Sequence, residues 1–210
     1  ICDVSNSQNI PVLVDNTFAT PLLQRPLELG AALSLTSTTK YINGHSDALG
    51  GSVCTNNADW NNKMIFAQKA LGLQPSPFDC WLITRGVKTL ALRLERQVAN
   101  AEAIANQLAE NPYVKWVRYP FRSDHPQQKI ALKQMHSGGA IIAASLKTNR
   151  SQTYSICKSM KYFTMAESLG GVESLICHPA TMTHASVAPE IRSQLGIDNS
   201  LIRLSIGCED

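Results

Sequence analysis

Hydrophobic positions along the chain follow one pattern before about residue 88 and another after it. In the first part, strand-like runs at 10–14, which is continuously apolar, and at 33–36 alternate with amphipathic stretches. A continuous apolar run of this length is typical of a strand buried on both faces of a parallel sheet. The segment between the two runs is long enough for the crossover helix that parallel strands require. The pattern therefore predicts an α/β fold whose sheet is mostly parallel.

Apolar periodicity predicts further elements in both parts of the chain. The predicted strands cover residues 10–14, 33–36, 50–55, 114–119, 140–146, 175–177 and 201–206. The predicted helices cover residues 21–29, 58–71, 88–110, 125–135, 150–159 and 189–195. Elements after residue 88 lack the regular strand–helix–strand order of the first part, which indicates a smaller α+β domain. We therefore place a domain boundary at residue 88, with domains of residues 1–88 and 89–210.

Composition narrows the classes of protein to which the chain can belong. Of its 210 residues 44% are hydrophobic and 17% are charged, and the net charge is only +3, which excludes disorder as the main state. No apolar run approaches the roughly 20 residues that a membrane span needs. The basic residues are scattered rather than clustered, which argues against nucleic-acid binding. We expect neither a membrane nor a nucleic acid as partner.

The cysteines and the chain ends add three expectations. None of the six cysteines forms a C-x-x-C pair, so we expect free thiols in a reducing cytoplasm rather than a disulfide scaffold. Cys177, His178 and His184 lie close together, but their spacing matches no standard zinc motif, and we expect no metal. The chain begins at Ile1 rather than at Met and ends directly after a predicted strand, so we expect a fragment of a longer protein.

Candidate chemistry concentrates at the ends of the first two predicted strands. Asp15 ends the first strand, and Lys40 follows the second, preceded by the hydroxyls of Ser37 and Thr39. Ligands of α/β sheets bind at the carboxyl edge of the strands, where a desolvated lysine amine is a nucleophile or Schiff-base former. Pyridoxal phosphate needs such an amine, an acid for its ring nitrogen and donors for its phosphate. Two alternatives stay open: Lys40 as a solvated loop residue, and Asp15 as a turn or capping residue.

One further cation stands out near the end of the chain. Along the last predicted strand, Ile202, Leu204 and Ile206 share one face, which leaves Arg203 and Ser205 on the other. An arginine fork in that place suits two-point binding of a carboxylate. The alternative is an ordinary cross-strand salt bridge.

Five motifs in the same order resemble the Cys/Met-metabolism family of pyridoxal-phosphate enzymes. They occupy residues 14–21, 37–47, 163–175, 181–185 and 201–207, and so are spread across nearly the whole chain. The resemblance implies the architecture of fold-type I pyridoxal-phosphate enzymes. Residues 1–88 would be the C-terminal portion of the large cofactor-binding domain, and residues 89–210 a small α+β domain that is incomplete at its end. A long N-terminal part, which family members carry, would be missing.

The resemblance also implies roles for individual residues. Lys40 would carry pyridoxal 5′-phosphate covalently and later move protons, and Asp15 would pair with the ring nitrogen. The phosphate would be bound by Ser37 and Thr39. The substrate α-carboxylate would be bound by Arg203 with help from Ser168. Glu167 would meet the distal amino group of cystathionine.

Within the family, the chain resembles the trans-sulfuration enzymes that act at the γ-carbon of homoserine-derived amino acids. The first hypothesis is a cystathionine γ-synthase, which joins an O-acylhomoserine and cysteine to give cystathionine. The alternatives are a cystathionine γ-lyase, which releases cysteine, 2-oxobutanoate and ammonia, and a catalytically inactive truncated fragment. The resemblance also implies a homotetramer built from dimers that share their active sites.

Overall fold

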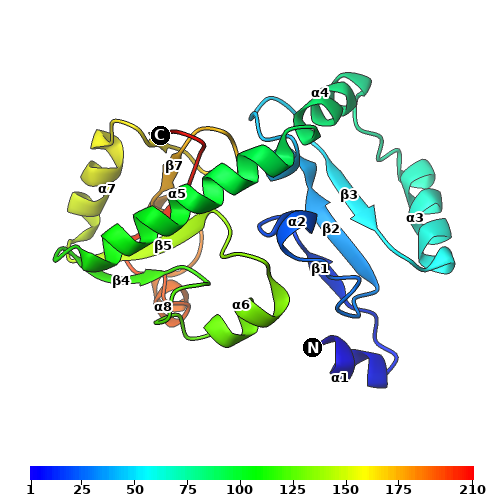
Figure 1. Cartoon of the computed structure of the whole chain (residues 1–210), viewed down its shortest axis with the longest axis horizontal. Helices are drawn as coiled ribbons and strands as arrows, with labels where there is room; N and C mark the ends of the chain where they lie inside the picture. The colour runs from blue at the N-terminus through cyan, green and yellow to red at the C-terminus, as the bar shows by residue number, and fades with distance from the viewer. The chain divides into compact units, whose positions relative to one another are not determined.

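The computed structural model describes residues 1–210 and divides into two compact units (Figure 1). The first unit comprises Ile1–Ala91 and Gln134–His136, and the second comprises Leu92–Lys133 and Ser137–Asp210. The boundary that we placed at residue 88 follows α4 (Pro77–Val87). No helix of the structure combines the length and the apolar character that crossing a bilayer requires.

The first unit is built on a three-stranded sheet of order β1-β2-β3. Its strands are β1 (Leu13–Asp15), β2 (Leu33–Ser37) and β3 (Gly51–Cys54). β1 and β2 are parallel, as the apolar runs predicted, and β3 is antiparallel to β2. The prediction that the first strand is buried on both faces was wrong, because Leu13 is 50% exposed and no residue of β1 is buried.

The helices of the first unit are α1 (Cys2–Ser7), α2 (Thr20–Leu23), α3 (Ala58–Leu71) and α4. α3 has the predicted bounds, because Asn57 caps its start and Gly72 ends it in the left-handed conformation at φ 66°. α2 is shorter than the predicted helix at 21–29. Its chain becomes extended at Gln24, and Pro26 follows closely, which disfavours a continued helix.

α4 was not predicted from the sequence. Pro75 and Pro77 lie at its start, and prolines disfavour a helix that continues through them. In the structure Ser76 accepts a hydrogen bond from the N–H of Asp79 at 3.1 Å, and Pro77 occupies the first helical position. Serine followed by proline is a start signal for a helix as well as an interruption of the preceding one.

The second unit has the α+β organisation that the sequence predicts. Its five-stranded sheet has the order β4-β5-β8-β7-β6, and only the pair of β6 and β7 is parallel. The strands are β4 (Val114–Arg118), β5 (Ile141–Leu146), β6 (Thr164–Met165), β7 (Leu175–Cys177) and β8 (Leu201–Ser205). The helices are α5 (Leu90–Glu110), whose first two residues belong to the first unit, α6 (Gln128–Gln134), α7 (Arg150–Ser159) and α8 (Pro189–Gln194).

The core of the second unit lies around the middle strands of its sheet. β8 is buried on both faces, with Ile202 on one side and Ser205 on the other. The buried stripe of α5 includes Leu94, Ala101 and Ala105, at the spacing that an amphipathic helix requires. The side chain of Gln97 on this helix donates to the carbonyl of Gly171 at 2.7 Å. The long helix is therefore tied to the loop before β7.

Candidate active site

Four predicted site residues lie at one edge of the first unit's sheet. β1 and β2 pair in parallel with Asp15 opposite Leu35, so their carboxyl ends lie side by side. Asp15 is the last residue of β1 and Ser37 the last residue of β2. Thr39 and Lys40 follow in a π-helical turn, η1 (Thr38–Ile42). The structure thus brings these four residues together at the carboxyl edge of the strands, where α/β proteins bind ligands.

Thr17 links the ends of the two strands, a role that the sequence did not reveal. One carboxylate oxygen of Asp15 accepts the N–H of Thr17 at 3.0 Å. The buried hydroxyl of Thr17 accepts the N–H of Ser37 at 2.8 Å. An aspartate whose side chain accepts the N–H two residues later forms an Asx turn. Because aspartate is common in such turns, this local contact could have been predicted from the sequence. Its contact with Ser37, twenty residues away, could not.

The turn that carries Lys40 is fixed by its own backbone and by Asn43. The conformation at Lys40, φ −91° and ψ −126°, is not helical and interrupts the turn. Around it, the carbonyl of Lys40 accepts the N–H of Gly44 at 2.8 Å, and the N–H of Asn43 donates to Thr38 at 3.0 Å. Asn43 is 1% exposed, and its side-chain amide donates to Asp47 at 2.8 Å. The backbone on the C-terminal side of Lys40 therefore has little freedom to move.

The residues of this edge fit pyridoxal phosphate in part. Asp15 is exposed and uses one carboxylate oxygen in its turn, which leaves the other for a protonated ring nitrogen. The hydroxyl of Ser37 does not cap the turn after it, so it can donate to a phosphate oxygen. Thr39 differs, because its hydroxyl donates to the carbonyl of Gly50 at 3.3 Å and accepts the N–H of Gly50 at 3.0 Å. Its proton is engaged within the protein.

The other three predicted residues lie in the second unit. Arg203 on β8 donates through Nη2 to the carbonyl oxygens of Glu167 at 2.5 Å and Ser168 at 3.2 Å. Its Nε is buried and has no hydrogen-bond partner. Arg203 forms no ion pair, so the alternative of a cross-strand salt bridge was wrong. The carboxylate of Glu167 is exposed. The guanidinium is therefore oriented by neutral carbonyl groups and keeps its charge uncompensated.

Ser205 supports the same loop and was not singled out as a site residue. Its hydroxyl is 1% exposed and accepts the N–H of Gly170 at 2.9 Å. Gly170 has φ 80°, a conformation that favours glycine. Arg203 and Ser205, which the alternation along the strand predicted to share one face of β8, thus both hold the loop at 167–170.

The histidines near β7 have structural partners. His178 is fully buried, and its ring nitrogens contact the Thr181 hydroxyl at 2.7 Å and the Asn199 carbonyl at 3.0 Å. Nearby, the buried Arg192 donates through Nη1 to the carbonyls of Ala180 at 3.0 Å and His184 at 3.3 Å. The motif at 181–185 is therefore held by Arg192 and His178, which sequence analysis did not connect.

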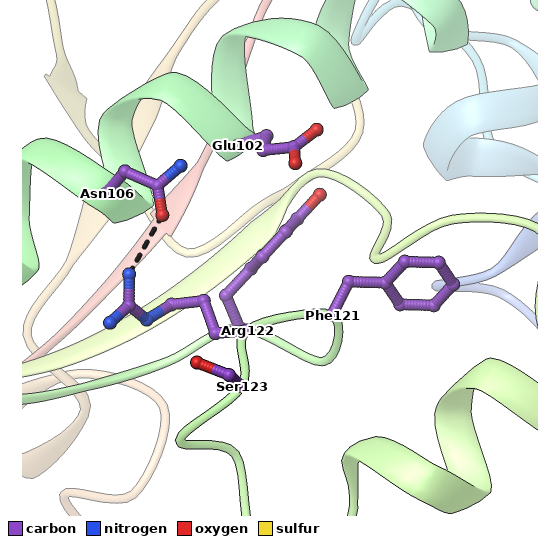
Figure 2. Close-up of a pocket in the computed structure, with 6 residues that line it drawn as sticks. Glu102, Asn106, Phe121, Arg122 and Ser123 are labelled. Atoms are coloured by element: carbon purple, nitrogen blue, oxygen red, sulfur yellow. Dashed lines mark hydrogen bonds between the residues drawn. The ribbon is translucent and has the colours of Figure 1, made fainter.

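Two cavities of the second unit lie away from the predicted site residues. One, of about 480 Å³, is lined by Arg150, Ser151, Tyr154 and Thr181. The other, of about 160 Å³, is lined by Glu102, Asn106, Tyr119, Phe121, Arg122 and Ser123 (Figure 2). Figure 2 shows Arg122 reaching toward Asn106, to which it donates at 2.9 Å. Arg122 also pairs with Asp124, which holds the pKa of that carboxyl below its usual range.

Comparisons with a family model, with known proteins and with solved structures all identify the same family. The family model described as Cys/Met metabolism PLP-dependent enzyme matches residues 1–210. The chain is 48% identical to a cystathionine γ-lyase of Dictyostelium discoideum and 47% identical to a cystathionine β-lyase of Coxiella burnetii, in each case over 100% of this chain and 54% of the relative. The chain spans about half the length of these relatives.

A solved structure confirms the predicted fold. The cystathionine γ-synthase of Xanthomonas oryzae pv. oryzae, in complex with aminoacrylate and cysteine, matches with a TM-score of 0.96 and 44% identity. The match covers 99% of this chain and 54% of that one. Agreement of this kind over a whole chain leaves little room for a different arrangement of strands and helices within either unit. The chain belongs to the Cys/Met-metabolism family of PLP-dependent enzymes.

Proposed function

We propose that the protein is a trans-sulfuration enzyme that acts at the γ-carbon of a homoserine-derived amino acid, as a cystathionine γ-synthase. The observation that carries the proposal is the arrangement around Arg203. Its guanidinium is held by the carbonyls of Glu167 and Ser168 and has no carboxylate partner. The α-carboxylate of an amino-acid substrate would supply the missing counter-charge of the Arg203 guanidinium through charge-assisted hydrogen bonds. The exposed carboxylate of Glu167, whose backbone carbonyl contacts the Arg203 guanidinium, would meet the distal ammonium group.

The residues of the first unit would hold the cofactor. Pyridoxal phosphate, when bound, supplies an electron-accepting ring that stabilises negative charge at the substrate α-carbon. Asp15 would bind the ring nitrogen, Ser37 would donate to the phosphate, and Thr39 would do so only after giving up its bond to Gly50. Lys40 would hold the cofactor and, once released, would move the α-proton of the substrate to the neighbouring carbon.

The substrate of such a reaction would be an O-acylhomoserine, with cysteine as the sulfur donor and cystathionine as product. A cystathionine γ-lyase would use the same residues on the same carbon skeleton. Relatives of nearly equal identity are named as γ-lyase, γ-synthase and β-lyase, so identity does not choose between these activities. Glu167 suits the distal amino group of cystathionine, which is the product of a γ-synthase and the substrate of a γ-lyase, so we place the γ-synthase first and keep the γ-lyase as the alternative.

We also propose that the protein works in the cytoplasm as a homotetramer of dimers that share active sites. The six cysteines are free, which suits a reducing compartment. Large apolar side chains of the first unit are exposed, with Phe66 at 73% and Trp81 at 59%. Apolar surface of this kind supports an interaction with further protein. Size-exclusion chromatography with light scattering distinguishes a tetramer from an aggregating or monomeric fragment.

The function is tested first by visible absorbance after incubation with pyridoxal phosphate. The chain, and the longer protein if the gene encodes one, are compared with their Lys40→Ala variants. We expect an absorbance band that depends on Lys40. A band that persists in Lys40→Ala would contradict the role assigned to this lysine. The absence of a band in the 210-residue chain alone would support the alternative of an inactive fragment.

Product analysis then separates the activities. A γ-synthase forms cystathionine from an O-acylhomoserine and cysteine, a γ-lyase forms 2-oxobutanoate from cystathionine, and a β-lyase forms pyruvate from it. Arg203→Lys serves as the site control, because a lysine keeps the charge but lacks the planar fork. We expect the KM for the amino acid to rise in this variant. An unchanged KM would contradict carboxylate binding at Arg203.

A further inference from the structure

Two glycines contact the turn that carries Lys40. Gly50 lies just before β3, and Gly86 lies in the last turn of α4. Neither has a positive φ, so the conformational freedom of glycine does not explain them. Both lie unusually close to the turn instead.

Gly86 contacts the backbone at the end of the turn. A Cβ at this buried glycine would overlap the carbonyl oxygen of Asn43 and lie 3.0 Å from its carbonyl carbon. Asn43 cannot easily yield, because its N–H donates to Thr38 and its side chain donates to Asp47. Helix α4 therefore meets the turn backbone to backbone, in a way that only glycine permits.

Gly50 contacts the beginning of the turn. Its carbonyl accepts the N–H of Thr38 at 3.0 Å, and its own N–H donates to the Thr39 hydroxyl at 3.0 Å. A Cβ at Gly50 would lie 2.6 Å from Oγ1 of Thr38 and 3.1 Å from Cδ1 of Ile83. The adjacent Gly51 differs, because the nearest atom to its Cβ would be 3.8 Å away, an ordinary contact.

We propose that Gly50 and Gly86 are positioning residues that hold the Lys40 turn from its two ends. The inference rests on the proposed function, in which Lys40 carries the cofactor. Lys40 lies between the two contacts at the point where the turn departs from helical geometry. A shift at either end redirects the bond from its Cα to its Cβ. Misplacement of a reacting group by about 1 Å can cost roughly 100-fold in rate.

The first test needs no cofactor. Hydrogen–deuterium exchange is measured on the whole chain for Gly86→Ala, Gly50→Ala and the matched control Gly51→Ala. We expect the amides of Asn43 and Gly44 to exchange about tenfold faster in the first two variants and at the original rate in the control. Faster exchange throughout the first unit would indicate a general structural role and would overturn the proposal.

A rescue variant makes the test independent of folding problems at Gly86. Oγ1 of Thr38 is the atom that a Cβ at Gly50 would meet first, and it has no hydrogen-bond partner to lose. We therefore expect Thr38→Ala combined with Gly50→Ala to restore slow exchange at residues 43 and 44. If Gly86→Ala does not fold, this pair decides the question. Failure of the rescue would overturn the steric explanation.

The second readout follows the lysine itself. Each variant is incubated with pyridoxal phosphate, reduced with sodium borohydride, and the rate of labelling at Lys40 is measured by peptide mass spectrometry. We expect about a 100-fold slower rate in Gly50→Ala, recovery with Thr38→Ala, and no change in Gly51→Ala. If total incorporation of the reduced cofactor into Lys40→Ala is as fast as into the unchanged protein, other lysines account for the labelling and the proposed function fails. If Lys40 is labelled at equal rates in all glycine variants, the positioning role fails instead.

Discussion

The hydroxyl of Tyr119 gives the sharpest quantitative prediction for the second unit. Tyr119 is 2% exposed, and its hydroxyl donates to the buried carbonyl of Gly139 at 3.0 Å. Burial, with a smaller contribution from the charge of Glu102, raises the pKa of Tyr119 well above its ordinary value of 10. The substitution Tyr119→Phe removes the hydroxyl and keeps the ring.

At neutral pH the substitution should lower the free energy of unfolding. It leaves the carbonyl of Gly139 buried without its donor, which costs about 1–3 kcal/mol. The ring still fills its place, so no large cavity is created. The expected loss is therefore about 1.5 kcal/mol at pH 7, within the range for one buried hydrogen bond.

The difference should shrink at high pH. A raised pKa in the folded state stabilises the fold fully below the pKa of the unfolded chain, and this contribution is lost as pH rises from about 10 toward the folded value. In that range, ionisation of Tyr119 stabilises the unfolded state of the unchanged protein by about 1.4 kcal/mol per pH unit. The Tyr119→Phe variant has no such stabilisation, because phenylalanine cannot ionise. The stabilities of the two proteins should therefore meet near pH 11.

Urea unfolding of both proteins at pH 7, 9, 10 and 11 tests this reasoning. Other titrating groups are common to the two proteins and cancel in the difference. Tyr113→Phe is the matched control, because Tyr113 is 75% exposed and its ionisation should affect folded and unfolded states alike. A stability difference between Tyr119→Phe and the unchanged protein that stays constant from pH 7 to 11 would refute the explanation.

Three further measurements test the packing of the second unit. In Gly138→Ala, a Cβ would lie 2.5 Å from Cζ and 2.7 Å from Cε1 of Tyr119, so we expect a loss of about 1–3 kcal/mol in urea unfolding; no loss would mean that the ring moves aside. Burial raises the pKa of the Cys157 thiol to about 11, so Ellman's reagent at pH 8 should modify it at least about 100-fold more slowly than the exposed Cys54, and equal rates would contradict its burial. Arg192→Ala removes the donor of the buried carbonyl of Ala180 and of the partly buried carbonyl of His184, and it should cost about 2–3 kcal/mol in thermal or urea unfolding. Arg192→Lys should recover only part of this loss, and full recovery would show that charge alone suffices.

Elements with strong local signals could be predicted closely from the sequence. α3 and α7 have the predicted bounds because each is capped by an asparagine side chain, Asn57 and Asn149. Local signals were misread where one residue serves two purposes. Pro77 is an example, because proline interrupts helices and also begins them, and no helix was predicted at 77–87. The exposure of Leu13 could not be inferred either, because an apolar run does not say what covers it.

The predicted site residues are those that chemistry marks by residue type and strand position. Asp15 and Lys40 could be proposed because strand ends are readable and their charges are distinctive. Thr17, Gly50 and Gly86 were missed because their roles are contacts with residues far away in the sequence. Gly50 and Gly51 are adjacent in the sequence, and nothing in it distinguishes the glycine that touches Thr38 from the one that does not.

Each unit has a predicted site residue whose charge has no ion-pair partner within the protein, and this indicates the kind of ligand that each could bind. Asp15 in the first unit and Arg203 in the second each lack an ion-pair partner. The lack of an ion-pair partner costs Asp15 little free energy, because an exposed carboxylate is solvated by water. Arg203 is different, because its Nε is buried without an acceptor and its Nη2 contacts only neutral carbonyls. A partly buried cation without a counter-ion is costly, which supports the proposal that an anionic ligand supplies the missing charge. An amino-acid carboxylate has the planar shape that a guanidinium binds at two points.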